Sequence, residues 1–296
     1  MMATAVADWR ANPGTCGEGG RRLERIAAVR ESEPARKVAA DTLPPRGPGA
    51  FRKEFIAKKA SNRIGIGVLT YMGLGDVQIN VPSILEHAQP NCDVFVFDNS
   101  ENGHIGAWLN AKCPQVTYIK SPENVGCANG RNRMLEWSAS RGHQWVLMQD
   151  QDVRWAGDAG AAMLAVARHY PDTGCVSWPL AVKQMGNHKW DKTGALDPPE
   201  TPGMCCLYSV KALTEGDDPG LVAWCPDYHM YRFDTDACFS LSKKGYAVRA
   251  VIDGPSLVRH DHPHTGIKRY PRWREEQRRS LGIFAERAKR YGWPSI

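Results

Sequence analysis

Residues 63–71 read RIGIGVLTY, a short apolar run that predicts a buried strand. Three similar runs follow, CDVFVFDNS at 92–100, QVTYIKS at 115–121 and QWVLMQD at 144–150. Between and after them, the spacing of apolar residues predicts helices over 77–88, 126–139 and 159–170. Strands that alternate with helices of this length imply an α/β fold, with a mainly parallel central sheet flanked by helices. Ligands then bind at the carboxyl ends of the strands.

Further regular structure is expected beyond residue 200. CCLYSVKAL (205–213) resumes an ordered pattern, FDTDACFSLSKKGY (233–246) predicts a helix that ends at Gly245, and AVRAVID (247–253) predicts a strand. The last helix is expected over 273–291, with Leu281, Phe284, Ala288 and Tyr291 on one apolar stripe.

The composition excludes several classes of protein. With 296 residues and 42% hydrophobic content, the chain can bury a full core. It has no run of about 18 apolar residues and no secretory signal, so we expect a cytoplasmic protein, with peripheral attachment to a membrane or to DNA as the alternative. Nine cysteines without a CxxC pair argue against a disulfide framework and a zinc ribbon, and we expect reduced, packed thiols.

Charge divides the chain into three parts. Residues 1–60 carry a net charge of +5, residues 259–296 carry +6 and the span between carries −5. We expect a basic N-terminal extension over 1–60 that is partly disordered or helical, one folded domain over 61–265, and a basic amphipathic helix over 266–296. The basic ends would meet an anionic partner, such as a nucleic acid, a phospholipid surface or a diphosphate. Solvated ends that only keep the protein soluble are the alternative.

Two carboxylates follow the fourth strand in MQDQDV (148–153). Residues two apart in an extended chain point to the same side, so Asp150 and Asp152 can both address one hard cation. Mg²⁺ or Mn²⁺ would take their oxygens together with two phosphate oxygens and neutralise a leaving diphosphate. Turn-forming aspartates after a strand are the alternative, but the position of this pair favours a metal site.

Two other polar segments lie where a nucleotide would bind. In VFDNSENG (96–103), Asp98 and Asn99 could bind ribose hydroxyls or a base N–H, although a strand-to-turn cap also explains them. In SPENVGCANGRNRML (121–135), glycines and asparagines let the backbone approach a ligand, and Arg131 or Arg133 could meet a phosphate. An ordinary helix start is the alternative for this second segment.

In this order, the segments resemble the family 2 type of inverting glycosyltransferases with the GT-A fold, especially the rhamnosyltransferase-like branch. The residues that carry the resemblance are VLTY (68–71), FDNS (97–100), NVGCANGRN (124–132) and QDQD (149–152). PGMCCLYSVKAL (202–213) is similar to the acceptor-side segment of the family, and FDTDACFSLSKKGY to the helix after it. The resemblance covers about residues 63–264, and four ordered motifs with near-normal spacing argue against chance.

The resemblance implies a single nucleotide-sugar-binding domain with GT-A-like architecture, and it assigns roles by position. Residues that would hold the nucleotide or shape the donor site are Thr70, Asp98, Asn99, Asn124, Gly126, Gly130 and Asn132. Asp150 and Asp152 would bind the metal and the diphosphate.

Asp234 would be the general base that takes the proton of the acceptor hydroxyl. Phe233 stands where the family pattern has a glutamate, and this departure leaves the base between Asp234 and Asp236. Capping of a helix N-terminus is the alternative role for both aspartates.

Histidines stand at alternate positions in RHDHPHTG (259–266). The family often uses a histidine near this point to complete the metal shell or to contact the diphosphate. Two imidazoles two residues apart could share a metal and three would crowd it, so the choice among His260, His262 and His264 stays open. A zinc site and loop histidines without a role are the alternatives.

These features predict a metal-dependent inverting glycosyltransferase that moves a hexosyl or deoxyhexosyl group from a nucleoside diphosphate sugar to a hydroxyl acceptor, with Mn²⁺ or Mg²⁺. A glycan or lipid-linked sugar is the expected acceptor, with the basic helix on an anionic membrane surface. The alternative is a hydroxymethylated base in DNA, as in phage-type DNA modification, with the basic ends on phosphates and the base flipped towards Asp234. A non-catalytic nucleotide-sugar-binding protein is the second alternative, which Phe233 favours and the retained aspartates oppose.

Overall fold

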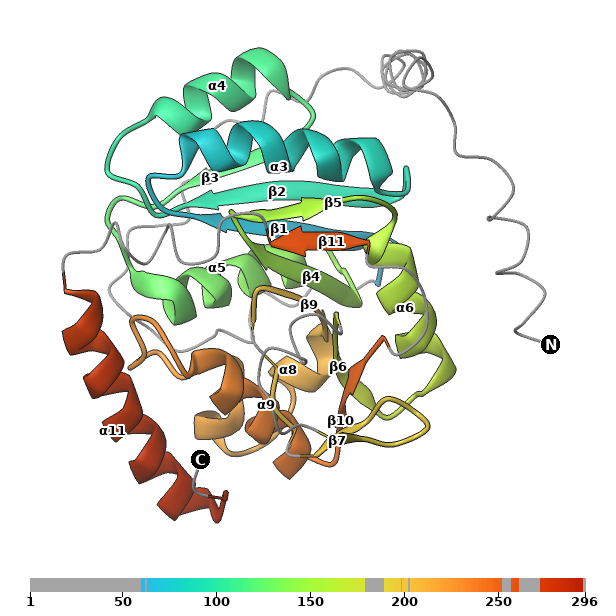
Figure 1. Ribbon diagram of the computed structural model, residues 1–296, viewed down its shortest axis with the longest axis vertical. Helices are drawn as coiled ribbons and strands as arrows, with labels where there is room; N and C mark the ends of the chain where they lie inside the picture. Colours follow the sequence, from blue (N-terminus) through green and yellow to red (C-terminus); the bar gives the residue numbers. More distant parts are fainter. Residues whose placement is uncertain are drawn as a thin grey trace. The chain divides into compact units, whose positions relative to one another are not determined.

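The four predicted apolar runs form neighbouring parallel strands (Figure 1). They are β1 (Ile64–Thr70), β2 (Cys92–Asp98), β3 (Thr117–Lys120) and β4 (Trp145–Asp150). Strand β1 lies between β2 and β4, in a register that pairs Thr70 with Asp98 and Leu69 with Asp150. The polar residues at the carboxyl ends of three strands therefore meet at one edge of the sheet.

A computed structural model of the chain describes residues 60–61, 63–178, 189–197, 199–201, 203–251, 257–260 and 272–294. The central sheet has the strand order β10-β6-β9-β4-β1-β2-β3, with β6 at Thr173–Ser177, β9 at Cys205–Ser209 and β10 at Ala247–Ala250. Strand β9 runs antiparallel to both of its neighbours, and every other pairing in this sheet is parallel. The prediction of a mainly parallel α/β sheet is confirmed.

Helices cover both faces of the sheet (Figure 1). One face packs against α3 (Leu74–His87), α4 (His104–Lys112) and α6 (Ala159–His169). The other packs against α5 (Gly126–Ser140), α8 (Val210–Thr214), α9 (Phe233–Lys243) and α11 (Trp273–Tyr291), with the short 3-10 helix η3 (Pro219–Leu221) nearby. Because both faces are covered, the strands are apolar along most of their length.

Two small antiparallel ribbons complete the described structure. Strand β5 (Val153–Trp155) pairs with β11 (Val258–His260), and β7 (Lys189–Trp190) pairs with β8 (Leu196–Asp197). The first ribbon pairs His260 with Val153 and so brings a residue from far along the chain to the end of β4.

Close packing explains the glycines that interrupt β1. A side chain at Gly67 would collide with Met134 of α5 and with Phe95 of β2. Helix α5 can therefore approach this strand only where the side chain is missing.

Helix boundaries mostly follow the predictions. Helix α3 begins at Leu74, three residues before the predicted start, and α9 ends at Lys243, with Gly245 in the left-handed conformation at φ +86°. Helix α11 has the predicted limits, but one residue of its predicted buried stripe is wrong: Leu281 is 45% exposed. Ser280 takes the buried position, because its hydroxyl donates a hydrogen bond to the carbonyl of Met230.

Several other expectations concern the ends of the chain and the thiols. Residues 1–59 of the predicted basic extension and residues 266–271 of the predicted C-terminal segment lie outside the described residues. In the described ranges, no helix is both long and apolar enough to cross a membrane. The eight cysteines in these ranges are free and seven of them are buried, as predicted.

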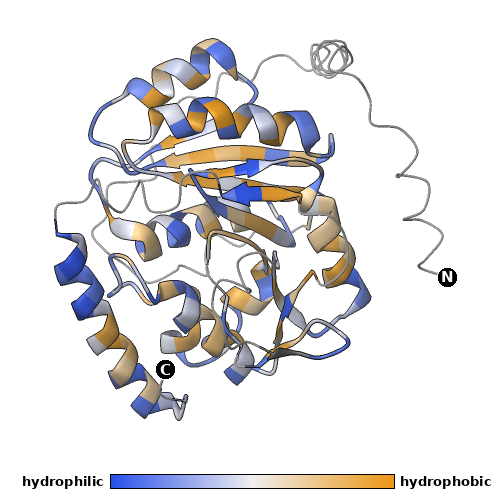
Figure 2. Ribbon diagram, viewed as in Figure 1, coloured by the Kyte–Doolittle hydropathy of each residue, from blue (hydrophilic) through white to orange (hydrophobic). Residues whose placement is uncertain are grey.

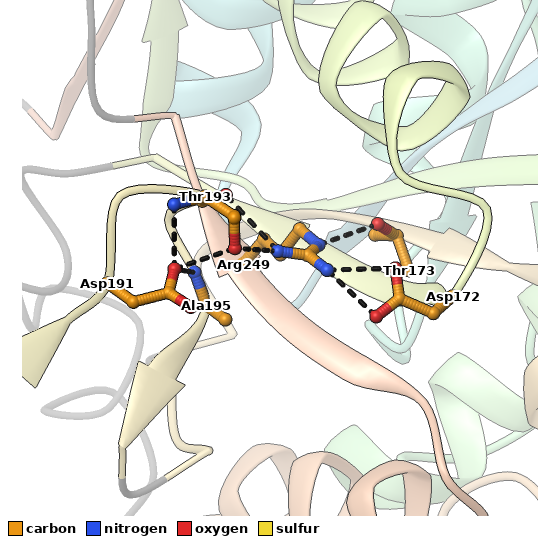
Figure 3. A network of polar contacts seen from close by, with 6 residues as sticks. All are labelled: Asp172, Thr173, Asp191, Thr193, Ala195 and Arg249. Carbon is orange, nitrogen blue, oxygen red and sulfur yellow. Dashed lines mark hydrogen bonds and ion pairs between the residues drawn. The ribbon is translucent and has the colours of Figure 1, made fainter.

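Arg249 on β10 ties the edge of the sheet to the turn between β7 and β8 (Figure 3). Its Nη2 lies 2.8 Å from both carboxylate oxygens of Asp172, and its Nε donates to the hydroxyl of Thr173 at 3.0 Å. Its Nη1 donates to the carbonyl and the hydroxyl of Thr193. The guanidinium also lies 4.3 Å from the ring centroid of Tyr170, and only 4% of the residue is exposed. This cluster lies apart from the cavity described below.

A second polar cluster, built around the buried side chains of His143 and Ser138, lies at the amino ends of the strands. His143 Nε2 lies 2.9 Å from Asp93 Oδ2, and His143 Nδ1 lies 2.8 Å from the hydroxyl of Ser138 on α5. Arg63 also pairs with Asp93. Burial alone would raise the pKa of Asp93, but its hydrogen bonds with His143 and Arg63 outweigh burial and lower that pKa.

Candidate active site

A cavity of about 540 Å³ opens at the carboxyl ends of β1 and β4. One wall comes from the strand ends, a second from the start of α9 with Glu200, Gly203 and Met204, and an outer wall from residues 229–232 with α11. The predicted site residues that line the cavity are Thr70, Asn99, Asn124, Gly126, Asp150, Asp152, Asp234 and His260. Ligand binding at this edge of the sheet was the expectation for a parallel α/β fold.

The turn that carries Asp150 and Asp152, the predicted metal ligands, is fixed by the residue between them. Gln151 is buried, and its Oε1 accepts hydrogen bonds from the Thr70 hydroxyl at 2.7 Å and the Tyr71 N–H at 2.8 Å. Its Nε2 donates to Asp76 Oδ2 at 3.0 Å, and its carbonyl accepts from Asn80. These four hydrogen bonds hold the Gln151 side chain and carbonyl against the protein interior. The carboxylates of Asp150 and Asp152, on either side of it, line the cavity.

Strand β11 places one predicted histidine beside the second aspartate. His260 Nε2 lies 3.2 Å from Asp152 Oδ1, and both side chains are mostly buried. An imidazole and a carboxylate at this distance can take the same cation. His262 and His264 lie outside the described residues.

Arg131 lies beneath the first aspartate. Its side chain is fully buried, and its Nη2 donates to Asp150 Oδ1 at 2.9 Å and to the carbonyl of Gly203 at 2.6 Å. The N–H of Gly203 in turn donates to Asp234 Oδ2 at 2.6 Å. A continuous hydrogen-bonded path therefore joins Asp150 to Asp234. The prediction that Arg131 or Arg133 meets a phosphate stays untested, and neither residue lines the cavity: Arg131 is buried against Asp150, and Arg133 pairs with Glu136.

The electrostatics of the cavity favour a cation. Burial raises the pKa of Asp150 to about 6, Arg131 opposes this shift, and the nearby carboxylates of Asp152 and Asp234 add to it. The side chain of Asp150 is 43% exposed, so solvent weakens the part of this pKa shift that burial causes. Three carboxylates around one cavity repel one another, and a divalent cation would relieve this repulsion.

The two candidate bases on α9 occupy different environments. Asp234 lines the cavity, where its Oδ1 accepts from the N–H of Thr235 at 2.9 Å and its Oδ2 accepts from Gly203. Asp236 is fully buried, forms an ion pair with Arg287 and accepts from the Tyr228 hydroxyl at 3.1 Å. Asp236 does not line the cavity, so its predicted catalytic role is corrected to a structural one.

Three predicted donor-site residues do not line the cavity. Asp98 is buried and accepts hydrogen bonds from the Ser100 N–H and the Tyr118 hydroxyl, both at 2.8 Å. Asn132 holds the backbone of Trp224 through both its amide nitrogen and its amide oxygen. Gly130 packs against Leu69, so all three support the walls of the cavity rather than form its surface.

Gly126 lines the cavity and has a conformation that glycine favours. Its φ is +81°, and a side chain there would come within 2.6 Å of the carbonyl of His229. The neighbouring Cys127 N–H donates to the same carbonyl. The glycine-rich loop is thereby fixed to the outer wall of the cavity.

Glu200 was not anticipated from the sequence. It lies in the cavity wall with a side chain that is 2% exposed, and its Oε1 accepts from Arg232 at 2.9 Å and from the Thr235 hydroxyl at 2.7 Å. It follows a stretch of loop, and nothing in the local pattern marks it as a site residue. Gln151 and the buried position of Arg131 were missed for the same reason, because both depend on contacts that are distant in sequence.

Residues 66–234, more than half of the chain, match the model of the family described as Glycosyl transferase family 2. The chain belongs to glycosyl transferase family 2. The resemblance found in the motifs is therefore confirmed at the level of the family, while the rhamnosyltransferase-like branch remains a prediction. No curated protein is significantly similar to this family 2 chain in sequence.

Solved structures share the fold. The mannosyltransferase PcManGT from Pyrobaculum calidifontis, in complex with GDP-Man and Mn²⁺, is 17% identical with a TM-score of 0.52, over 90% of this chain and 72% of that chain. TarS 1–349 of S. aureus in complex with UDP is 13% identical with a TM-score of 0.45, over 64% and 56% of the two chains. GalNAc-T7 with UDP, GalNAc and Mn²⁺ is 12% identical with a TM-score of 0.47, over 64% and 41%. The first of these likenesses establishes the GT-A fold of the chain, and it does not extend to substrates.

Proposed function

We propose that this chain is a metal-dependent inverting glycosyltransferase that uses a nucleoside diphosphate sugar and Mn²⁺ or Mg²⁺. The observation that carries the proposal is the placement of Asp150, Asp152 and Asp234 around one cavity in a family 2 chain. The first two come from the end of β4, and the third comes from the first turn of α9. Because the two proposed metal ligands and the proposed base lie on separate elements, a donor and an acceptor can bind between them.

The residues of the cavity fit a hard cation held in part by substrate. In the described ranges, no group of three His, Cys, Asp or Glu side chains is arranged to hold a metal on its own. Mg²⁺ in phosphate-transfer sites is commonly bound by one or two carboxylates together with substrate phosphates, and Asp150 and Asp152 supply such a pair. His260 would add a third ligand through its contact with Asp152. When bound, the cation would stabilise the negative charge of the departing diphosphate.

Asp234 fits the role of general base. Its carboxylate accepts hydrogen bonds from two backbone N–H groups, which hold it in one orientation at the helix N-terminus. In the proposed reaction the acceptor oxygen bonds to the anomeric carbon as the bond from that carbon to the diphosphate oxygen breaks. The hydroxyl proton passes to Asp234 and the nucleoside diphosphate leaves. Direct displacement of this kind inverts the configuration at the anomeric carbon.

Asn99, Asn124, Gly126 and Thr70 are proposed to form the nucleotide side of the site, since all four line the cavity. The Thr70 hydroxyl already donates a hydrogen bond to Gln151, so its contribution would be to position the turn that carries Asp150 and Asp152. A hexosyl or deoxyhexosyl donor is proposed, and the structure of PcManGT in complex with GDP-Man and Mn²⁺ supports a donor of this class.

The acceptor is proposed to be a hydroxyl on a glycan or lipid-linked sugar, or on a modified base in DNA. A non-catalytic nucleotide-sugar-binding protein is the competing function, and Phe233 at the usual place of an acid is the feature that favours it. Turnover separates these functions, because a binding protein would hold the donor without hydrolysing or transferring it.

The test is a panel of nucleoside diphosphate sugars, with binding followed by thermal shift and hydrolysis by release of the nucleoside diphosphate, each with and without Mn²⁺. Asp152→Asn should abolish metal-dependent donor binding. Asp234→Asn should leave donor binding intact and reduce turnover by about 10²–10⁴-fold, the range for loss of a general base. Asp217→Asn changes an exposed carboxylate away from the cavity and serves as the matched control. Full activity of Asp234→Asn would exclude it as the base, and absence of metal-dependent binding to any donor would overturn the proposed function.

A further inference from the structure

The outer wall of the cavity differs in chemistry from the wall that carries the aspartates. It is formed by residues 229–232 and by Gln277 and Leu281 of α11. The aspartate wall is acidic and suits a cation, whereas the outer wall carries a cation and an aromatic ring, Arg232 and Tyr231. An acceptor that approaches Asp234 from outside would pass this wall.

Arg232 is fixed in place before any ligand arrives. Its Nη1 lies 2.9 Å from Glu200 Oε1, and its guanidinium lies 5.9 Å from the ring centroid of Phe284 on α11. Tyr231 and Arg232 both have left-handed backbone conformations, at φ +60° and +57°. Residues with a Cβ rarely adopt this conformation, so the surrounding contacts hold the turn in it. The Arg232 side chain is still 31% exposed and lines the cavity, with its charge balanced by Glu200.

Helix α11 extends the basic character of this wall outward. Gln277 and Leu281 line the cavity, and Arg274 and Arg278 lie three residues before each of them on the same side of the helix. Both arginines are exposed. The Arg274 guanidinium carbon lies 5.2 Å from the ring centroid of Trp273, and because the ring carries no net charge, this contact does not neutralise the arginine. Figure 2 shows the first half of the helix as hydrophilic.

Three other basic residues in or next to α11 pair with acids, whereas Lys289 and Arg290 are exposed near its far end. Arg272 pairs with Glu275, Arg279 pairs with Glu276, and Arg287 pairs with Asp236. Next to the cavity wall, the exposed positive charge therefore lies at Arg274 and Arg278, one helical turn apart, and Glu275 offsets part of the charge of Arg278.

We propose that the outer wall binds a nucleic-acid strand as the acceptor, with its phosphates on Arg274 and Arg278 and its reacting nucleotide inside the cavity beside Tyr231 and Arg232. This inference rests on the proposed glycosyltransferase function and names the class of acceptor for the same site. Arginines a turn apart can follow a chain of phosphates, and an aromatic ring can stack on a base. The combination of a basic track and an aromatic side chain is typical of sites for single-stranded nucleic acid.

A membrane surface fits this helix less well. A helix that lies in the membrane interface needs an apolar face free to insert. The apolar residues of α11 pack inside the protein. The ring centroid of Phe284 lies 6.0 Å from that of Phe239 and 5.9 Å from that of Trp293, and Ala288 and Tyr291 are buried. Leu281 is the one large apolar side chain of α11 that stays exposed. The outward face is therefore polar and positively charged, which suits a polyanion in water.

The test measures binding of a fluorescein-labelled single-stranded DNA of about 20 nucleotides to the full-length chain, by fluorescence anisotropy over a series of KCl concentrations. The wild type should bind with an affinity that falls steeply with salt. The double variant Arg274→Gln/Arg278→Gln should bind about 10-fold more weakly at low salt, and the slope of log K against log [KCl] should become shallower by about 1.4, from two lost phosphate contacts.

The matched control is Lys289→Gln/Arg290→Gln, which removes two exposed cations from the same helix about three turns further on. This control should bind DNA within about twofold of the wild type and keep its salt slope. Equal losses in the two double variants would overturn the proposal, because they would show only general attraction to a positive protein. Binding of phosphatidylserine vesicles that exceeds binding of DNA, and that depends on Arg274 and Arg278, would also overturn it in favour of a membrane.

The donor assay separates this proposal from the proposed function. Arg274→Gln/Arg278→Gln should bind the sugar nucleotide with Mn²⁺ as the wild type does, while Asp152→Asn should lose donor binding and keep DNA binding. Donor binding and turnover without any DNA binding would sink the acceptor proposal and leave the glycosyltransferase standing. DNA binding without metal-dependent donor binding would do the reverse.

Discussion

The affinity of the protein for Mn²⁺ should depend on pH through Asp150. Burial and the carboxylates of Asp152 and Asp234 keep the pKa of Asp150 raised at about 6 in the metal-free protein, even though Arg131 opposes the shift. A metal binds the carboxylate and not the acid, so it must displace the proton wherever Asp150 is protonated. The affinity for Mn²⁺ should therefore be at its maximum above this pKa and should fall as the pH drops through it.

The size of the effect follows from the fraction of Asp150 that is ionised. With a pKa of about 6, roughly 90% is ionised at pH 7 and roughly 10% at pH 5. The apparent Kd for Mn²⁺ should rise about tenfold between these pH values, with about half a proton released per metal at pH 6 and about 0.9 at pH 5. Calorimetric titrations in two buffers of different ionisation enthalpy measure both quantities.

Two controls isolate Asp150 in this experiment. The titration uses Mn²⁺ alone, because phosphate groups themselves titrate near pH 6. His260→Asn removes the imidazole beside Asp152, and the tenfold change should persist in it. Arg131→Met should move the midpoint to higher pH, since Arg131 lowers the pKa of Asp150. An unchanged Kd from pH 7 to pH 5 without proton release, in protein that stays folded, would refute the assignment of Asp150 as a metal ligand that must first lose its proton.

Three further substitutions test the supports of the site. Gln151→Leu should lower the free energy of unfolding by about 2–4 kcal/mol, because the buried groups that bond to the amide lose their hydrogen-bond partner. It should also weaken Mn²⁺ binding. Denaturant unfolding measures the first effect and metal titration the second. Arg249→Met should cost about 1–3 kcal/mol and leave Mn²⁺ and donor binding unchanged, since its contacts with Asp172 and Thr193 lie outside the cavity; altered donor binding would contradict this separation. Gly126→Ala should destabilise by more than about 1 kcal/mol in thermal unfolding and weaken donor binding, because a side chain at φ +81° would collide with His229.

The sequence was sufficient to predict the framework of this fold. Short, mostly apolar runs form four neighbouring parallel strands, and the polar residues at their ends meet because parallel strands end at the same edge. The limits of α11 were predicted at both ends, since its apolar spacing is regular and Gly292 follows it in the left-handed conformation. The direction of β9 was not predictable, because a short apolar run looks the same in either orientation.

The site was predicted in part, and the misses share a physical cause. Asp234 and Asp236 are equivalent in sequence, and only the rotation of α9 against the sheet decides that one lines the cavity while the other pairs with Arg287. Arg131 reads as a phosphate ligand, yet the close approach of α5 to β1 buries it beneath Asp150. Pairings across such distances in sequence are set by packing, which no local pattern records.

The cluster of Ser138, His143 and Asp93 has the hydrogen-bonding order of a hydrolase triad, at distances of 2.8 and 2.9 Å. Ser138 is completely enclosed, and a side chain at Gly65 would come within 2.7 Å of its hydroxyl, so no carbonyl substrate can reach it. A search by geometric template would therefore report an esterase at the wrong end of this molecule. A nucleophile must be accessible to its substrate, so in this protein the three residues have a structural role: they join β2, the segment before β4 and α5 at the end of the sheet opposite the cavity.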